Sequence, residues 1–79
     1  QGDALSQLAL GMMYDQGKGV LQDYKQAVRW YRKAADQGYA PAQTELGVMY
    51  RGGKGVAQDD KQAARWFRKA ANQGNDNGQ

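Results

Sequence analysis

The chain carries nearly the same segment twice, 36 residues apart. When residues 1–38 are aligned with residues 37–74, 25 of the 38 pairs are identical. A period between about 20 and 50 residues is typical of arrays in which each unit buries its apolar face against the next unit. The sequence therefore predicts two stacked units that share one continuous core, an architecture that generally serves as a binding scaffold.

With 79 residues, the chain is long enough for one small domain of marginal stability. It has no cysteine and no histidine, so we expect no disulfide, no metal site and no cofactor. No apolar run approaches the roughly 20 residues that a membrane span requires, and no signal peptide is visible, so we expect no membrane insertion. A net charge of +3 favours solubility but does not identify a partner.

Apolar and small residues recur at helical spacing in two segments of each copy. The first helix is expected from Ala4 to about Gln16, and Pro41 suits the first turn of its counterpart. One face of the first helix consists of Ser6, Leu10, Met13 and Tyr14. The equivalent residues in the second copy are Ala42, Leu46, Met49 and Tyr50. The chain has no β-branched run and no period-two alternation, so we expect no strand. The predicted fold class is all-α, an α/α superhelical solenoid of two helix-turn-helix repeats with four antiparallel helices.

The second helix of each copy is expected to begin after an aspartate, at Asp23 and Asp59. Asp23 with Gln26, and Asp59 with Gln62, resemble a capping box. In that motif the carboxylate accepts a hydrogen bond from a first-turn N–H, and the Gln side chain reaches back to the N–H of the cap. Glycines are expected to stop the four helices, at Gly17, Gly38, Gly53 and Gly74.

These boundaries define the expected domain organisation. The two repeats should cover residues 1–74, with one repeat at about 2–37 and the other at about 38–73. The last five residues, 75–79, contain only Asn, Asp, Gly and Gln, so a flexible tail is expected there.

Small and aromatic residues are expected to do much of the packing. Gly11 and Gly47 occupy mid-helix positions, where Gly costs about 1 kcal/mol relative to Ala, and this predicts a close helix crossing in each copy. Trp30 and Trp66 supply the large apolar area that Ala cannot. The residues to which the sequence assigns a structural role are Gly11, Tyr14, Asp23, Trp30, Gly47, Tyr50, Asp59 and Trp66.

The consensus of the two copies, LGxMYxxGKGVxQDxKQAxRWxRKAAxQG, resembles the Sel-one-like repeat, an α/α solenoid unit related to the tetratricopeptide repeat. LG-x-x-Y is shared with tetratricopeptides, whereas the GxGV loop, the QD before the second helix and the W-[YF]-x-K-A-A-x-x-G ending are typical of the Sel-one-like repeat. The resemblance implies a right-handed superhelix used for protein–protein interaction, without catalysis. Many members are bacterial and exported, so it favours the periplasm or secretion over the cytoplasm. Several bacterial members have disulfides, which this chain cannot form.

The residues themselves also argue against catalysis. Without His or Cys, the aliphatic hydroxyls of Ser6 and Thr44 are the remaining nucleophile candidates, and Ser6 occupies the place of Ala42 in the other copy. A carboxylate dyad would need two acids that converge in a cleft, and the acids here are mostly caps or isolated charges. The Gly-Lys-Gly loops follow helices and lack the GK[ST] of a phosphate-binding loop. We therefore expect no catalytic residue and no enzyme.

Cations follow the second helix of each copy: Lys25, Arg29, Arg32 and Lys33, repeated as Lys61, Arg65, Arg68 and Lys69. Their spacing places several of them on one face. A solvated outer face explains this row better than contact with a nucleic-acid backbone, because the interleaved aromatics follow the apolar face. We do not expect nucleic acid to be the partner.

The positions at which the copies differ indicate where a partner could bind. Differing pairs on the first helix of each copy include Leu5/Pro41, Leu8/Thr44, Ala9/Glu45, Met12/Val48, Asp15/Arg51 and Gln16/Gly52, and their spacing traces one helical face. The first helices of stacked repeats commonly line the binding surface. The predicted residues for binding a protein or peptide partner are Leu5, Leu8, Met12, Thr44, Glu45, Val48 and Arg51.

A second interpretation of the same face remains open. Leu5, Leu8, Ala9 and Met12 are unusually apolar for a first helix, and they could instead pack against another repeat. Arrays usually need three or more repeats for stability. The alternative function is therefore self-association through the end repeats, for example by exchange of helices, which would make the chain a homo-oligomer.

Overall fold

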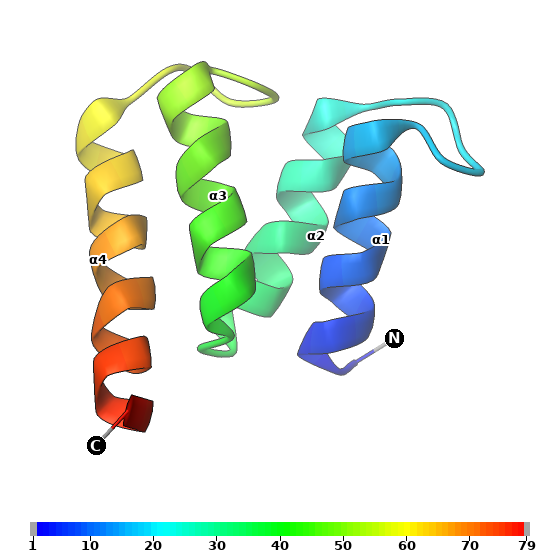
Figure 1. The fold of residues 1–79 in the computed structure, drawn as a ribbon. Helices are drawn as coiled ribbons and strands as arrows, with labels where there is room; N and C mark the ends of the chain where they lie inside the picture. The colour runs from blue at the N-terminus through cyan, green and yellow to red at the C-terminus, as the bar shows by residue number, and fades with distance from the viewer. Residues whose placement is uncertain (1, 79) are drawn as a thin grey trace.

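The computed structural model describes the backbone of residues 2–78 and the side chains of residues 2–73. Over this range the chain forms helices and no strand, which confirms the predicted all-α class. The helices, in chain order, are α1 (Ala4–Gln16), α2 (Tyr24–Asp36), α3 (Ala40–Gly52) and α4 (Asp60–Gly78). Each helix packs antiparallel against the next, so α1 and α4 lie at opposite ends of a row (Figure 1).

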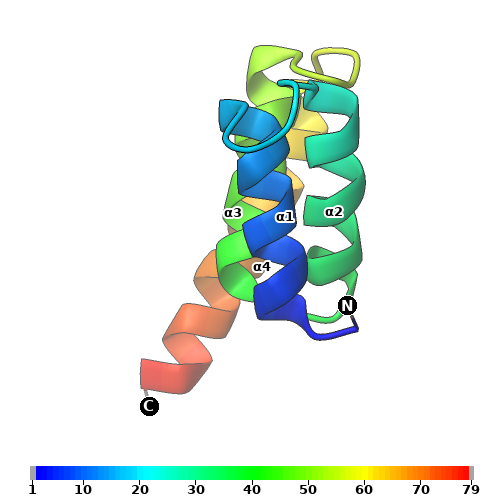
Figure 2. The same cartoon turned by 90° about the vertical axis from the view of Figure 1, so that its right-hand side faces the viewer.

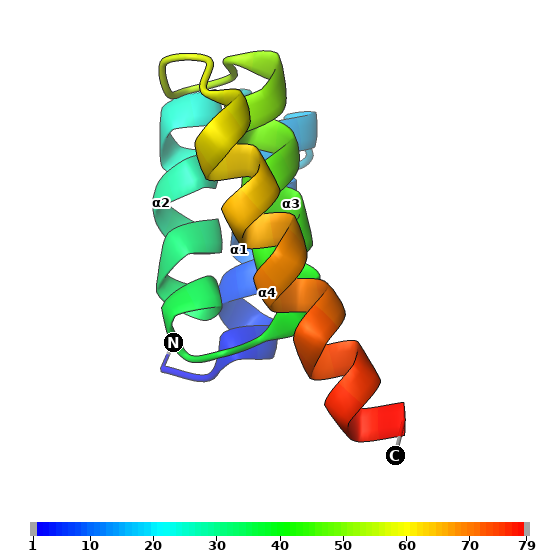
Figure 3. The same cartoon turned by 90° about the vertical axis from the view of Figure 1, so that its left-hand side faces the viewer.

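The row has two sides, because the first helices of the repeats lie together. Viewed from the end of the row, α1 and α3 lie on one side and α2 on the other (Figure 2). From the opposite end, α4 crosses α3 at an angle and its C-terminal end projects beyond the other helices (Figure 3). In this arrangement the sides of α1 and α3 that point away from α2 and α4 are not covered by those helices (Figures 2 and 3).

The core is centred on the two helices at which the repeats meet, and residues of α1 and α4 pack against it. Its buried residues form one cluster that α2 and α3 supply together: Ala27, Val28, Tyr31, Ala34, Ala35, Ala42, Leu46 and Met49. Within each repeat, a glycine allows the two helices to approach closely. A Cβ added at Gly11 would lie 2.5 Å from Cδ1 of Tyr31, and one added at Gly47 would lie 2.7 Å from Cε1 of Phe67.

The aspartate caps are present, but the reciprocal half of the capping box is not. The Asp23 carboxylate accepts hydrogen bonds from the N–H groups of Lys25 (3.0 Å) and Gln26 (3.3 Å). The N–H of Asp23, to which Gln26 was expected to reach back, donates instead to the carbonyl of Tyr14 at 2.9 Å. Repeat two has the same arrangement, since the N–H of Asp59 donates to the carbonyl of Tyr50 at 2.9 Å. These two bonds tie each loop to the end of the preceding helix.

Three of the four predicted glycine stops are found. Gly17, Gly38 and Gly53 have φ values of 70°, 88° and 66°, in the left-handed region that Gly adopts at low cost. The prediction for Gly74 is wrong, because α4 continues to Gly78. Gly38 is followed by Tyr39, which packs against the core and anchors the turn, whereas only polar residues and Gly follow Gly74. The flexible tail expected at 75–79 stays a prediction, since Gln79 and the side chains of 74–78 lie outside the described residues.

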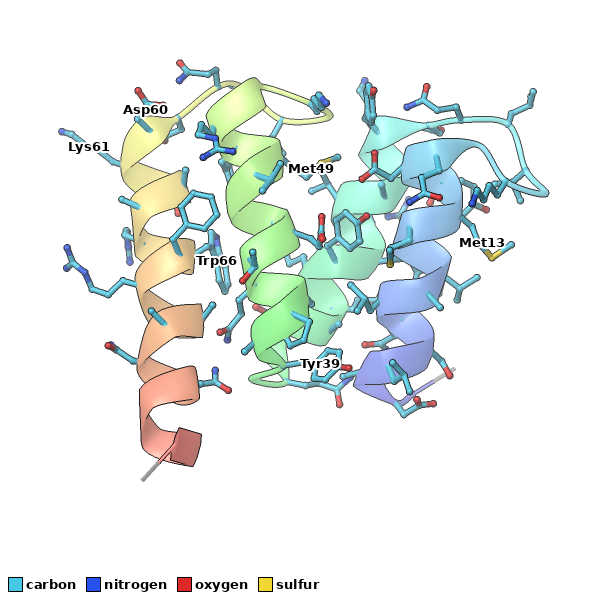
Figure 4. All side chains as sticks on the ribbon, in the orientation of Figure 1. Met13, Tyr39, Met49, Asp60, Lys61 and Trp66 are labelled. Atoms are coloured by element: carbon cyan, nitrogen blue, oxygen red, sulfur yellow. The ribbon has the colours of Figure 1, made fainter. Side chains whose placement is uncertain are left out.

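The tryptophans contribute less buried area than expected. Trp30 and Trp66 are both half-buried, and Trp66 packs against the edge of the core cluster. Trp66 points from α4 toward α3 (Figure 4). The ammonium groups of Lys33 and Lys69 lie 5.3 Å and 4.9 Å from the ring centroids of Trp30 and Trp66. Trp66 therefore sits at the border of the core, and each Trp has a cation from its own helix over its ring.

Candidate functional site

The candidate site lies on the open side of α1 and α3. Because Gly11 contacts a ring of α2 and Gly47 contacts a ring of α4, residues that lie about 100–160° around the helix from these glycines, on one side, point away from α2 and α4. We call this surface the A face. It consists of Leu5, Ala9 and Met12 of α1 with Pro41, Glu45 and Val48 of α3.

Large apolar side chains are exposed on the A face. Leu5 is 63% exposed and Met12 is 38% exposed, and Val48 adds a half-buried apolar side chain from α3. By contrast, Leu46 and Met49 of the same helix layer are 0% and 1% exposed. The exposed apolar residues of α1 thus belong to a surface that the fold of this chain does not cover.

Of the seven predicted partner-binding residues, three lie outside the A face as defined above, two of them at its edge. Leu8 is half-buried and packs against the core cluster, so it stabilises the contact between repeats. Thr44 and Arg51 are exposed on α3, at the edge of the A face. The guanidinium of Arg51 lies 5.4 Å from the ring centroid of Phe67 on α4, and this contact holds it beside its own repeat. The A face therefore retains Leu5, Met12, Glu45 and Val48 from the prediction.

Two carboxylates and a buried hydroxyl meet where the two repeats join. The Tyr31 hydroxyl donates to Oδ2 of Asp15 at 2.9 Å. Burial, together with the Asp15 carboxylate, raises the pKa of Tyr31 above its usual range, so the hydroxyl remains a donor. Burial also raises the pKa of Glu45, and the charge of Asp15 acts in the same direction. This acidic cluster, Asp15 with Tyr31 and Glu45, borders the apolar residues of the A face and favours a cation.

The acidic cluster was missed from the sequence, although a signal for it exists. Asp15 becomes Arg51 in repeat two, and Tyr31 becomes Phe67, so both members of the hydrogen bond change together. In repeat two the Arg51 guanidinium lies over the Phe67 ring. The equivalent contact in repeat one is the hydrogen bond from the Tyr31 hydroxyl to Asp15. A paired difference of this kind between copies indicates two residues in contact.

Glu45→Gln should raise the free energy of unfolding at neutral pH. The pKa of Glu45 is raised in the folded chain above its usual 4.5, so its ionised form opposes folding. That opposition is absent when Glu45 is protonated and grows as the pH rises through the raised pKa. The stability difference between variant and parent should therefore be largest near pH 7 and vanish below about pH 4.5, as urea titrations at several pH values would show. A difference of equal size at pH 4 and pH 7 would exclude this ionisation as its cause.

The cations of α2 and α4 divide into two groups. Arg32 donates a hydrogen bond to the Tyr50 hydroxyl, and its guanidinium lies 5.7 Å from the centroid of that ring. Lys33 and Lys69 lie over Trp rings, as described above. All eight cations are exposed, and the second group consists of Lys25, Arg29, Lys61, Arg65 and Arg68. Part of the row thus stabilises the fold, and its aromatic neighbours are engaged within the chain.

A pocket of about 400 Å³ lies where α2, α3 and α4 meet. It was not predicted, and it is lined by Ala35, Asp36, Gly38, Gln43, Trp66, Lys69, Asn72 and Gln73. Gln43 donates to the carbonyl of Ala35 at 3.2 Å and accepts from Gln73 at 2.9 Å. The bond to Ala35 joins the two repeats, and the bond from Gln73 joins α3 to α4 within repeat two.

Among the described residues, no three or more acidic, His or Cys side chains are placed to hold a metal ion. No helix in residues 2–78 is long and apolar enough to cross a membrane.

Comparison with known proteins gives the family. The Sel1 repeat family model matches residues 4–39 and 40–75, two residues later than the repeats expected from the sequence. A Sel1 repeat protein from Oxalobacter formigenes has a TM-score of 0.90 and 46% identity, over 91% of this chain and 29% of that one. The protein c5321, a protective antigen of uropathogenic Escherichia coli strains with an SLR fold, has a TM-score of 0.88 and 51% identity, over 90% and 15%.

A third solved structure, the cysteine rich protein B of Helicobacter pylori, has a TM-score of 0.84 and 33% identity, over 87% of this chain and 52% of that one. The chain therefore spans between 15% and 52% of these three bacterial proteins. No curated protein sequence matches the chain. Both repeats match the family model, and all three structures share the arrangement of the helices. The chain belongs to the Sel1 repeat family.

Proposed function

We propose that the chain is a non-enzymatic module that binds a protein or peptide segment on its A face. The observation that carries this proposal is the exposure of Leu5 and Met12, at 63% and 38%, on the open side of the helix layer. Sel1 repeat proteins are generally scaffolds for protein interactions and are typically without catalytic activity. The specific face and the chemistry of its partner are the part that we add.

The chemistry of the A face describes the segment that it would hold. Leu5, Met12 and Val48 offer apolar contacts from two helices, so the partner should present two or more apolar side chains toward them. Asp15 and Glu45 place negative charge at the join between the repeats, and a basic side chain in the partner would relieve their repulsion. A short segment with apolar residues around one Lys or Arg fits this description.

Met12→Asp should weaken partner binding by roughly 10- to 150-fold. Burying a Met side chain contributes about 1.5–3 kcal/mol, and a carboxylate placed there would have to be desolvated without a partner. The measurement begins with a displayed library of random peptides selected on the parent chain. Affinities of the selected peptides for parent and variant are then compared by isothermal titration calorimetry.

The matched control is Met13→Asp, the same substitution at the adjacent residue. Met13 is 37% exposed, nearly the same as the 38% of Met12, but it lies on a different side of α1. Peptides that bind on the A face should bind Met13→Asp as well as they bind the parent. Peptides that bind Met12→Asp at full strength, or that lose affinity only for Met13→Asp, would contradict the proposed face.

A further inference from the structure

The interface between the two repeats is the starting point of an inference that goes beyond the proposed function. At this interface α2 packs against α3, and side chains from both helices are almost completely buried. Val28 and Ala35 of α2 are 6% and 2% exposed, and Leu46 and Met49 of α3 are 0% and 1% exposed. One complete interface of this kind lies inside the chain.

The two ends of the row carry the two halves of a second interface of the same kind. On α1 the equivalents of Ala42, Leu46 and Met49 form a surface that we call the head face, which consists of Ser6, Leu10 and Met13. On α4 the equivalents of Val28, Arg32 and Ala35 form the tail face, which consists of Ala64, Arg68 and Ala71. Met13 is 37% exposed, Leu10 and Ser6 are half-buried, and all three tail-face residues are exposed.

The side chains at these two ends point away from the molecule. Met49 points from α3 toward repeat one, whereas Met13 points from α1 away from the other helices (Figure 4). Asp60, at the start of α4, lies at the opposite end of the row from Met13 (Figure 4). Head face and tail face are thus separated across the whole row, so one chain cannot bring its own two faces together.

The polar contacts of the internal interface also have counterparts at the ends. Arg32 donates to the Tyr50 hydroxyl, and the equivalent residues, Arg68 and Tyr14, are of the same types. Between two chains, Arg68 of one copy would therefore meet Tyr14 of the other. Both residue types of the internal contact are therefore present at the ends of the row, the Arg on α4 and the Tyr on α1.

One contact would change in a way that favours association. The ammonium of Lys54 lies 5.4 Å from the ring centroid of Tyr24, and the equivalents of these residues are Lys18 and Asp60. The ring is thus replaced by a carboxylate of opposite charge to the lysine. The loop of one copy could also approach α4 of the other closely. In the internal interface a Cβ at Gly55 would lie 2.5 Å from the Tyr24 carbonyl oxygen, so this position requires a glycine, and its equivalent, Gly19, is one.

We propose that the head face of one copy docks on the tail face of a second copy, in the geometry with which α3 packs on α2. Such a contact joins two different surfaces, so each added copy leaves one head face and one tail face open. Association of this kind has no natural end point, and the mean mass in solution increases with concentration. The occupant of each end face is a further copy of this chain.

Two variants that block different faces test the proposal. Met13→Asp places a carboxylate in the head face, and Ala64→Asp places one in the tail face at the position equivalent to Val28, which is 6% exposed in the internal interface. Both substituted side chains are exposed in the single chain, so the fold should be retained, and far-ultraviolet circular dichroism checks this. Ser6→Arg serves as a second head-face variant if Met13→Asp fails to fold.

Analytical ultracentrifugation then gives the decisive comparison. The parent chain should increase in mean mass with concentration, and each variant alone should remain at the 8.7 kDa of one chain. An equimolar mixture of the two variants should form a species of twice that mass and nothing larger, because one intact tail face meets one intact head face. Met12→Asp, on the A face, should associate like the parent chain.

Other outcomes overturn the proposal. A parent chain that stays at the mass of one copy at the highest concentration rules out docking between copies. Self-association of Ala64→Asp with the strength of the parent would show that two head faces meet each other. Loss of self-association in Met12→Asp but not in Met13→Asp would place the contact on the A face. Because the two proposals depend on adjacent methionines, the failure of either one can be told from the failure of the other.

Discussion

Leu46→Ala should lower the free energy of unfolding by about 2–5 kcal/mol, whereas Leu10→Ala should lower it by about 1 kcal/mol or less. The two leucines occupy the same position of the repeat. Leu46 is 0% exposed because α3 packs against α2, whereas Leu10 is half-buried on the head face. Truncation at Leu46 leaves a cavity in the core that joins the repeats, and truncation at Leu10 leaves one that solvent can fill.

The size of this effect makes it decisive for so small a chain. Small domains are typically stable by only about 5–15 kcal/mol, so the loss at Leu46 removes much of the total. Urea titration followed by circular dichroism measures both variants under the same conditions. Equal losses at Leu46 and Leu10 would show that the repeats are not stacked through α2 and α3.

Gly11→Ala should lower the free energy of unfolding by about 1–3 kcal/mol, although Ala is the better helix former. The added Cβ would lie 2.5 Å from Cδ1 of Tyr31 and 3.2 Å from the carbonyl oxygen of Ala27. Tyr31 cannot easily move, since it is 1% exposed and its hydroxyl is bonded to Asp15. The helices would therefore have to separate, and this outweighs the gain in helix propensity.

Gly52→Ala is the matched control for Gly11→Ala. Gly52 is also helical, but it is exposed, and the nearest atoms to its added Cβ belong to the flexible side chain of Lys54 at 3.7 Å. This variant should be more stable than the parent by up to about 1 kcal/mol. Thermal and urea unfolding measure both changes. A Gly11→Ala variant that gains stability as Gly52→Ala does would contradict the close packing of α1 on Tyr31.

The agreement between the copies was enough to predict the helices and their order. The starts of α2 and α4 follow from Asp23 and Asp59, whose side-chain hydrogen bonds are local and need no knowledge of the rest of the fold. The reach-back of Gln26 failed because the Asp23 N–H is used by Tyr14, nine residues earlier, and a contact across a loop is not visible in a short motif. Gly74 failed because a glycine ends a helix only where the following residues anchor a turn.

The candidate site was predicted less completely, for a related reason. The pairs that differ between the copies identified the outward half of α1 and α3, and Leu5, Met12, Glu45 and Val48 lie there. Leu8 differs from Thr44 for another reason, because Leu8 packs against the core while Thr44 is exposed. A residue that differs between the copies can therefore belong to a binding surface, or it can simply have different neighbours in each repeat. The structure is needed to distinguish these two cases.

The central claim is that the A face holds the partner, and an amide chemical-shift map tests it most directly. An isotope-labelled chain is titrated with a peptide selected from the displayed library, at a concentration where the chain is a single copy. The largest shifts are expected at Leu5, Met12 and Val48 on α1 and α3, with Met13 and the tail face unchanged. Shifts concentrated on the exposed cations of α2 and α4, or on the head face alone, would contradict the claim.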